Sequence, residues 1–202
     1  MTYSQVKDFK LPKIVDRKQK RKDIALSSTE LFCQKGFNNL TVSEVAKNAN
    51  VAKGTIYEYF KNKEDIIFAI IEYAYESYDK EVLENIYKST SVKEKILALF
   101  SMCIENNNLN SQRRQMYKEF MLIYLSHPND EIIQFQQSIR LKYTNWLTTI
   151  LQEAIDSKQL KPEAINFTNS LYTMGESVLL LSQNDILSSY IDSLYDLLKT
   201  GE

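Results

Sequence analysis

The sequence contains very little glycine or proline. Four glycines and three prolines occur among its 202 residues, and both residue types interrupt helices. No long run of alternating β-branched residues predicts strands in their place. The composition therefore predicts an all-α protein, and its content of 44% hydrophobic and 25% charged residues is ordinary for a chain that buries a core.

Histidine and cysteine are also scarce. His127 is the only histidine, and the two cysteines, Cys33 and Cys103, lie far apart in the chain. The sequence has no paired histidine or cysteine motif and no glycine-rich phosphate loop, so the residue sets that metal sites and nucleotide-dependent catalysis require are missing. We therefore expect neither an enzyme nor a bound metal or cofactor, and we expect both thiols to be packing residues.

Long hydrophobic runs are absent as well. The longest apolar stretches, such as residues 66–71 and 178–181, are much shorter than the ~18 residues that a membrane-spanning helix needs. Residues 1–16 are polar and lysine-bearing, and they lack the apolar centre of a secretory signal. We therefore expect a cytoplasmic protein that does not associate with membranes.

The charges that are present are distributed unevenly along the chain. Residues 1–63 contain 13 Lys or Arg and 6 Asp or Glu, a net charge of +7, whereas the remaining residues carry −8. Neutralisation of phosphates by Lys and Arg supplies most of the non-specific affinity of proteins for DNA. A basic amino-terminal part, densest at residues 17–22, is therefore typical of a protein that binds DNA through that part.

Residues 41–60 predict a helix-turn-helix. Thr41 precedes Glu44 by three positions, which is the spacing of a capping box at the start of a helix. Asn50 can adopt the left-handed backbone conformation that a tight turn requires. A second helix then begins near Lys53, and it is too short to be stable without packing against its neighbours.

The second of these helices combines a buried face with a chemically distinctive outer face. Ile56 and Phe60 point inward at i and i+4 spacing. The outer face carries lysine, threonine and two tyrosines, which can contact phosphates and base edges in the major groove. A solvated helix would explain any one of these residues, but the whole set after a capped helix and a turn favours DNA recognition.

The first third of the chain resembles the TetR family of transcriptional regulators (TetR/AcrR-type). Its signature is matched by Gly36-Phe37, Thr41-Val42, Val45-Ala46, Ala49-Asn50-Val51, Lys53-Gly54-Thr55-Ile56-Tyr57, Tyr59-Phe60 and Lys63-Glu64. The resemblance implies that operator DNA is contacted by Thr41, Lys53, Thr55, Tyr57, Tyr59 and Lys63. Three positions depart from an ideal recognition motif: Asn50 replaces the usual turn glycine, Ala52 replaces a common Ser or Thr cap, and Glu58 places a negative charge on the outer face.

The resemblance and the helical pattern together predict the domain organisation. We expect a basic arm at 1–16, a three-helix DNA-binding domain at 17–63, and an effector-binding and dimerisation domain at 64–202, with about nine helices in total. The apolar helices near 162–182 and 185–199 are expected to pair with a second copy of the chain, and Gly175 would allow a close approach of helices. The alternative is that these two helices only close the core of a monomer.

An effector cavity is implied by the resemblance and by the clustering of aromatic and methionine residues in the second part. Most such residues simply form core. The residues that we expect to line a cavity are Phe100, Cys103, Tyr117, Phe120, Tyr124, Tyr143, Trp146, Tyr172 and Met174. Glu105, Glu119 and Glu176 are candidate polar anchors, and an inward-facing carboxylate would favour a cationic effector.

The sequence thus predicts a DNA-binding transcriptional regulator, a homodimeric repressor that a small and largely apolar molecule releases from its operator. A ligand that prefers a different arrangement of the helices would weaken DNA binding through its differential affinity for the two states. The alternative is a protein of the same fold that organises DNA or marks a division site without a small-molecule effector.

Overall fold

The computed structural model describes residues 16–181 and 184–201, and within these ranges it contains eleven α-helices, one 3-10 helix and no strand. The elements are α1 (Arg17–Ser27), α2 (Thr29–Asn39), α3 (Val42–Asn48), α4 (Lys53–Tyr59), α5 (Lys63–Lys88), α6 (Val92–Leu99), α7 (Ser101–Ile104), α8 (Asn108–Ser126), α9 (Asp130–Asp156), η1 (Pro162–Phe167), α10 (Thr168–Leu181) and α11 (Asn184–Leu198). The all-α prediction is confirmed, although we expected about nine helices.

The larger number of helices results in part from two short breaks. Ser28 separates α1 from α2 with φ −95° and ψ 1°, and its Oγ donates to the carbonyl oxygen of Ile24 at 3.1 Å. Phe100 separates α6 from α7 in a similar conformation, with φ −101° and ψ 16°. The apolar residues before and after each break keep the spacing of one continuous helix. The hydrophobic periodicity of the sequence therefore does not reveal the breaks. The part we expected to hold three helices, residues 17–63, therefore contains four and the start of a fifth.

Side-chain caps begin several of the helices. Asn62 accepts a hydrogen bond from the backbone N–H of Asp65 at 2.8 Å and begins α5. Ser91 and Glu94 form a reciprocal capping box at α6. Asn129 caps α9 in the same way as Asn62 caps α5. Each cap satisfies a free backbone donor with a side chain three residues away, which is why sequence alone identifies it.

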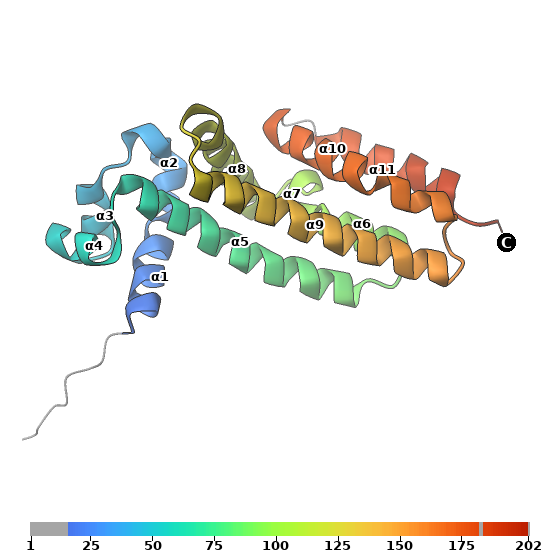
Figure 1. The fold of residues 1–202 in the computed structure, drawn as a ribbon, viewed down its shortest axis with the longest axis horizontal. Helices are drawn as coiled ribbons and strands as arrows, with labels where there is room; N and C mark the ends of the chain where they lie inside the picture. Colours follow the sequence, from blue (N-terminus) through green and yellow to red (C-terminus); the bar gives the residue numbers. More distant parts are fainter. Residues whose placement is uncertain (1–15, 182–183, 202) are drawn as a thin grey trace, which may run out of the picture.

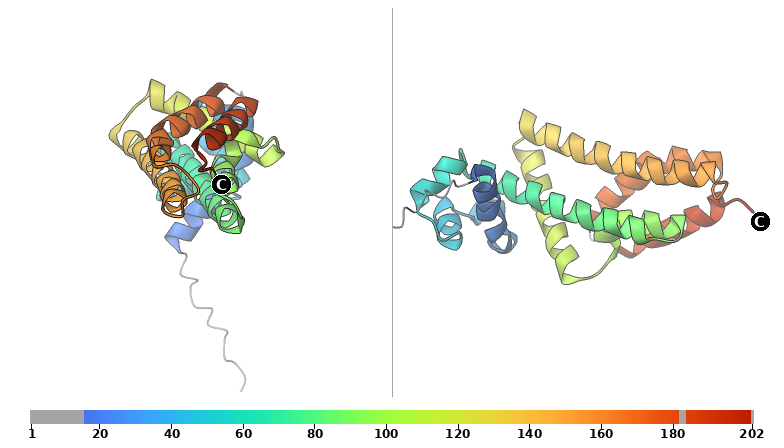
Figure 2. Two further views of the ribbon diagram at one scale, coloured as in Figure 1. Left: turned by 90° about the vertical axis from the view of Figure 1, so that its right-hand side faces the viewer. Right: turned by 90° about the horizontal axis from the view of Figure 1, so that it is seen from below.

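The helices form an elongated molecule. Figure 1 shows α1 to α4 at one end, α5 and α9 running along the length, and α10 and α11 towards the other end, where the chain terminates. The right-hand view in Figure 2 shows the same division between a small amino-terminal unit and a longer helical bundle. Among the helices described, none combines the length and apolarity needed to cross a bilayer.

Two hydrophobic cores lie within this architecture. The amino-terminal core joins residues of α1 to α4 with the first turns of α5, and it also includes Met116, Phe120 and Ile123 of α8 and Ile132 of α9. The second core lies among α5 to α11. Helices α5, α8 and α9 contribute to both cores. A boundary at residue 63 therefore divides the chain but does not divide the hydrophobic packing. The basic arm that we expect at 1–16 lies outside the described residues except for Asp16, which caps α1.

Candidate DNA-binding face and ligand cavity

The helix-turn-helix is built from α3 and α4 by short-range interactions. Thr41 Oγ1 accepts from the backbone N–H of Glu44 at 3.3 Å, and Glu44 Oε2 accepts from the backbone N–H of Thr41 at 3.1 Å. Asn50 has a φ of 54°, so it supplies the left-handed residue of the turn. The adjoining N–H of Val51 donates back to the carbonyl of Ala46 at 3.0 Å. The predicted capping box and turn are therefore confirmed.

Helix α4 presents a polar face to solvent and anchors itself through its apolar face. Ile56 is fully buried, whereas Tyr57 is 53% exposed. Lys53 is exposed at the first turn of α4, where Ala52 makes no side-chain capping bond. Thr55, also on α4, is half-buried. The side chains available to a DNA backbone or base edge therefore come from a short helix that has an uncapped amino terminus.

Two arginines hold the carboxy-terminal end of α4 in place. Arg17 Nη2 donates to the carbonyl oxygen of Glu58 at 2.6 Å, and Arg21 Nη1 donates to that of Tyr59 at 2.7 Å. Arg21 also forms an ion pair with Asp65 at 2.6 Å and lies 4.5 Å from the centre of the Phe60 ring. The pKa of Arg21 is raised mainly by its hydrogen bond to Asp65. The basic residues 17–22 were expected to lie against DNA phosphates. Arg17 and Arg21 instead donate to backbone carbonyls that are left free at the end of α4.

The remaining predicted DNA contacts already have structural partners. Thr41 is exposed but serves as the cap of α3. Lys63 Nζ donates to the carbonyl oxygen of Asn38 at 3.3 Å and lies 4.8 Å from the centre of the Phe37 ring. Tyr59 is half-buried. The structure therefore groups Lys53, Thr55 and Tyr57 on one helix, and it ties the other three predicted residues to the scaffold around that helix.

A narrow cavity of about 40 Å³ lies in the second core, between α5, α7, α8, α9 and α10. Its lining residues are Tyr75, Tyr78, Leu99, Phe100, Met102, Cys103, Tyr117, Ile139, Tyr143, Tyr172, Gly175, Glu176 and Leu179. Five of the nine residues expected to line a cavity are among them, namely Phe100, Cys103, Tyr117, Tyr143 and Tyr172.

The other four expected residues lie elsewhere. Phe120 belongs to the amino-terminal core, and Tyr124 packs against that core. Trp146 and Met174 pack against the second core without lining the cavity. Helical spacing identifies an apolar face, but it does not reveal which neighbouring helix that face meets. Gly175 illustrates the same point, because a Cβ added there would lie 2.8 Å from Cε1 of Phe100 in the same chain. Its close approach is within the subunit.

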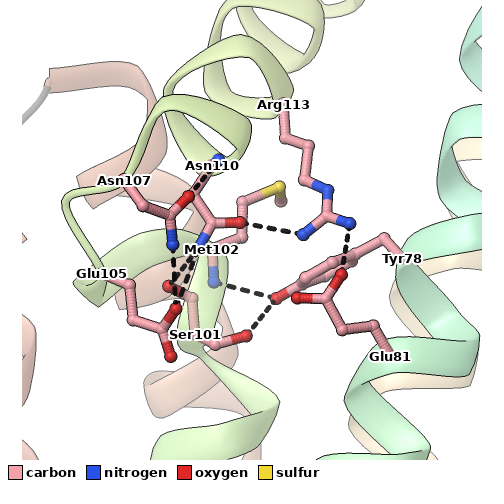
Figure 3. A network of polar contacts seen from close by, with 8 residues as sticks. All are labelled: Tyr78, Glu81, Ser101, Met102, Glu105, Asn107, Asn110 and Arg113. Carbon is pink, nitrogen blue, oxygen red and sulfur yellow. Dashed lines mark hydrogen bonds and ion pairs between the residues drawn. The ribbon is translucent and has the colours of Figure 1, made fainter.

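One wall of the cavity is fixed by a buried polar network (Figure 3). The Tyr78 hydroxyl accepts from the backbone N–H of Met102 at 2.9 Å and lies 3.1 Å from Ser101 Oγ. Arg113 is 9% exposed, lies 4.8 Å from the centre of the Tyr78 ring, and pairs with Glu81 at 2.5 Å. Burial raises the pKa of Tyr78, so this phenol stays neutral. The network joins α5, α7 and α8 and leaves the Tyr78 ring facing the cavity.

The three candidate acidic anchors occupy different environments. Glu176 lines the cavity. Glu105 is exposed, and its Oε2 accepts from Asn107 and Asn110, both at 3.2 Å. Glu119 accepts from the backbone N–H of Phe37 at 2.9 Å and so joins α8 to α2. The three residues are not brought together, and Glu176 is the one that the structure places at the cavity.

Comparison with known proteins identifies the family. Residues 26–70 match the family model described as bacterial regulatory proteins, tetR family. The chain is 32% identical over 151 residues to the fatty acid metabolism regulator protein of Bacillus subtilis, covering 71% of this chain and 74% of the relative. It is 29% identical over 85 residues to the HTH-type transcriptional repressor NemR of Escherichia coli, covering 42% and 43% of the two chains.

The whole fold is also shared with solved structures. A TetR-family transcriptional regulator from Cytophaga hutchinsonii superimposes with a TM-score of 0.79 at 18% identity, over 95% of this chain and all of the other. The sequence matches and the helix-turn-helix geometry agree with each other and with the helical carboxy-terminal domain. The chain belongs to the TetR family and is a DNA-binding transcriptional regulator.

Proposed function

We propose that this regulator is a cytoplasmic repressor that binds its operator as a homodimer and leaves it when a small, largely apolar ligand enters the cavity in the second core. The observation that carries the proposal is the position of α8, which contributes to the cavity and to the DNA-binding unit at once. The names of two relatives, a fatty acid metabolism regulator and a repressor, agree with repression that responds to a metabolite.

Helix α8 provides a physical route from cavity to DNA. Tyr117 of α8 lines the cavity, and Met116 and Phe120 beside it belong to the amino-terminal core. Glu119, two residues after Tyr117, holds the backbone N–H of Phe37 in α2. A ligand that displaces the Tyr117 ring would therefore move a helix whose other side packs directly against α2. The differential affinity of the ligand for the two positions of α8 sets how strongly DNA is released.

Dimerisation is supported by apolar side chains that the single chain leaves exposed on its last two helices. Leu180 and Leu181 of α10 and Ile186 and Leu197 of α11 are 40–66% exposed. A second copy packed on this face would remove them from water and would place two α4 helices at a fixed separation, as binding to two half-sites of an operator requires.

The dimer can be tested by light scattering at micromolar protein concentration. We expect the mass of a dimer for the wild-type chain and a shift towards monomer for Leu197→Glu. Leu141→Glu, at a 62% exposed leucine of α9, provides a control of matched chemistry. A wild-type monomer under these conditions would contradict the dimer.

The DNA-binding face can be tested by gel shift on fragments selected from a random DNA pool. We expect Lys53→Ala and Tyr57→Ala each to weaken binding by about tenfold. Lys53→Ala should also reduce the slope of log affinity against log salt by about one, because one phosphate contact is lost. Lys88→Ala and Tyr87→Ala make the same changes near the far end of α5, where Tyr87 is 91% exposed. Equal binding by the α4 variants and these controls would refute the assignment.

A further inference from the structure

The cavity in the second core has an unusual lining for an apolar site. Five of its side chains are tyrosines, and its one ionisable carboxylate is Glu176. The aromatic residues are Tyr75, Tyr78, Tyr117, Tyr143 and Tyr172. Tyrosine rings present negative faces that attract cations. Burial, together with the charge of Glu176, raises the pKa of Tyr117 and Tyr172, so both phenols stay neutral.

Glu176 has partners, but its strongest contact is with a neutral group. Its Oε1 accepts from Gln136 Nε2 at 2.8 Å and from the Tyr117 hydroxyl at 3.5 Å. Its Oε2 lies 3.4 Å from Nη1 of Arg140, whose guanidinium lies 5.2 Å from the centre of the Tyr172 ring. The Glu176 side chain is 18% exposed and that of Arg140 is 45% exposed. The Glu176–Arg140 ion pair is long, and Arg140 is largely solvated. Such a pair contributes little free energy, so a cation closer to Glu176 can displace Arg140.

Gln136 supplies a second acceptor beside this carboxylate. Gln136 is 9% exposed, and its Oε1 is buried without a hydrogen-bond partner among residues 16–181 and 184–201. Exchange of the amide oxygen and nitrogen would not remove the deficit, because it would place an oxygen against the Glu176 carboxylate. Buried polar atoms without partners are rare in native proteins. Gln136 therefore orients the Glu176 carboxylate through Nε2 and keeps a further acceptor, its own Oε1, on the same side chain.

We propose that the cavity binds a small protonated amine with an apolar body. Its ammonium donates to Glu176 and displaces Arg140 towards solvent, while the rings of Tyr117 and Tyr172 surround the charge. The apolar body lies against the remaining tyrosines and Leu179, and because a cavity of about 40 Å³ is smaller than a six-carbon chain, the lining rings move apart to admit it. This inference rests on the proposed function only where it implies that the bound amine releases DNA. The binding of the amine itself depends on the cavity alone.

An anionic head group fits the same atoms poorly. A carboxylate placed in the cavity beside Glu176 would meet the charge of that residue. Of the two charged partners in the Glu176–Arg140 pair, only Arg140 could attract it, at the exposed edge of the site. Substitutions of the two charged residues should therefore have opposite effects. Removal of the Glu176 carboxylate weakens the binding of an amine, whereas removal of the Arg140 guanidinium takes away a cation that competes with the amine for Glu176.

The test is calorimetric titration of the full chain without DNA, with hexylamine, hexanol and hexanoate as probes that share one apolar body. We expect hexylamine to bind at least about tenfold more tightly than the other two, as a charge-assisted hydrogen bond implies. Glu176→Gln should weaken hexylamine by about tenfold or more, and Arg140→Gln should bind it at least as tightly as wild type. Glu163→Gln, at an exposed residue of η1, should leave binding unchanged, and circular dichroism checks that each variant is folded.

Each alternative result overturns the inference. Hexanoate as the tightest probe, with Arg140→Gln weakening it and Glu176→Gln strengthening it, would make the cavity an anion site. Equal binding of hexanol and hexylamine would make it a purely apolar site, and no binding of any probe would exclude a small-amine site. Gel shifts test the proposed function separately: an amine that binds without releasing DNA would refute ligand-controlled release and leave the chemistry of the cavity intact.

Discussion

Substitution of Gly36 by alanine tests the contact between the DNA-binding unit and α8. Gly36 lies inside α2 with φ 70° and ψ 177°, a conformation that residues with a Cβ almost never adopt. A Cβ at this position would stand 3.0 Å from both carboxylate oxygens of Glu119. Glu119 can retreat only by giving up its 2.9 Å hydrogen bond from the N–H of Phe37. Gly36→Ala therefore strains the backbone and also removes a hydrogen bond to a charged group.

The expected destabilisation is the sum of two parts. The backbone conformation costs about 1–3 kcal/mol for a residue other than glycine. Loss of a hydrogen bond to a charged group costs about 1.5–3 kcal/mol, and partial exposure places this one at the low end. We expect Gly36→Ala to lower the free energy of unfolding by about 2–4 kcal/mol. Gly54→Ala is the matched control, because Gly54 is within α4 and nothing lies within 4 Å of an added Cβ. It should stabilise the protein by up to about 1 kcal/mol.

Urea unfolding followed by circular dichroism and by the fluorescence of Trp146, the only tryptophan, provides the measurement. The two probes should coincide if both cores unfold together. A double-mutant cycle with Glu119→Ala separates the two parts, since in that background Gly36→Ala retains only the backbone cost and the two changes are less than additive. A Gly36→Ala variant within about 0.5 kcal/mol of wild type, or strict additivity with Glu119→Ala, would refute the reasoning.

Two further predictions concern ionisable groups. Hydrogen bonds from Lys35 and from Thr41 lower the pKa of Glu44 from 4.5 to about 2, so its contribution to stability is complete above about pH 4.5 and is lost as the pH falls towards 2. Melting temperatures between pH 5 and pH 3 should therefore fall less steeply for Glu44→Gln than for wild type; identical slopes would exclude this role. Burial raises the pKa of the Cys103 thiol to about 12 and also raises that of half-buried Cys33. A thiol reagent should therefore leave Cys103 unmodified and label Cys33 slowly until the chain is unfolded, whereas two rapidly reacting thiols in the native protein would contradict this placement.

The sequence by itself determined the features that depend on neighbouring residues. The caps at Thr41, Asn62 and Ser91 and the left-handed turn at Asn50 each involve atoms no more than five positions apart. Such contacts form wherever the local spacing permits them, and their spacing can be read directly. The same is true of the polar outer face of α4, because the periodicity of one helix separates its buried side from its exposed side.

Only the tertiary structure decided which distant groups meet. The N–H of Phe37 and the carboxylate of Glu119 are 82 positions apart in the chain, and the carbonyl of Glu58 lies 41 positions from Arg17. The cavity includes Tyr75 and omits Trp146, because periodicity gives a helix its apolar face but does not specify the helix opposite. That choice depends on the packing of the whole bundle. The packing also brings a lone carboxylate and five tyrosines to one site.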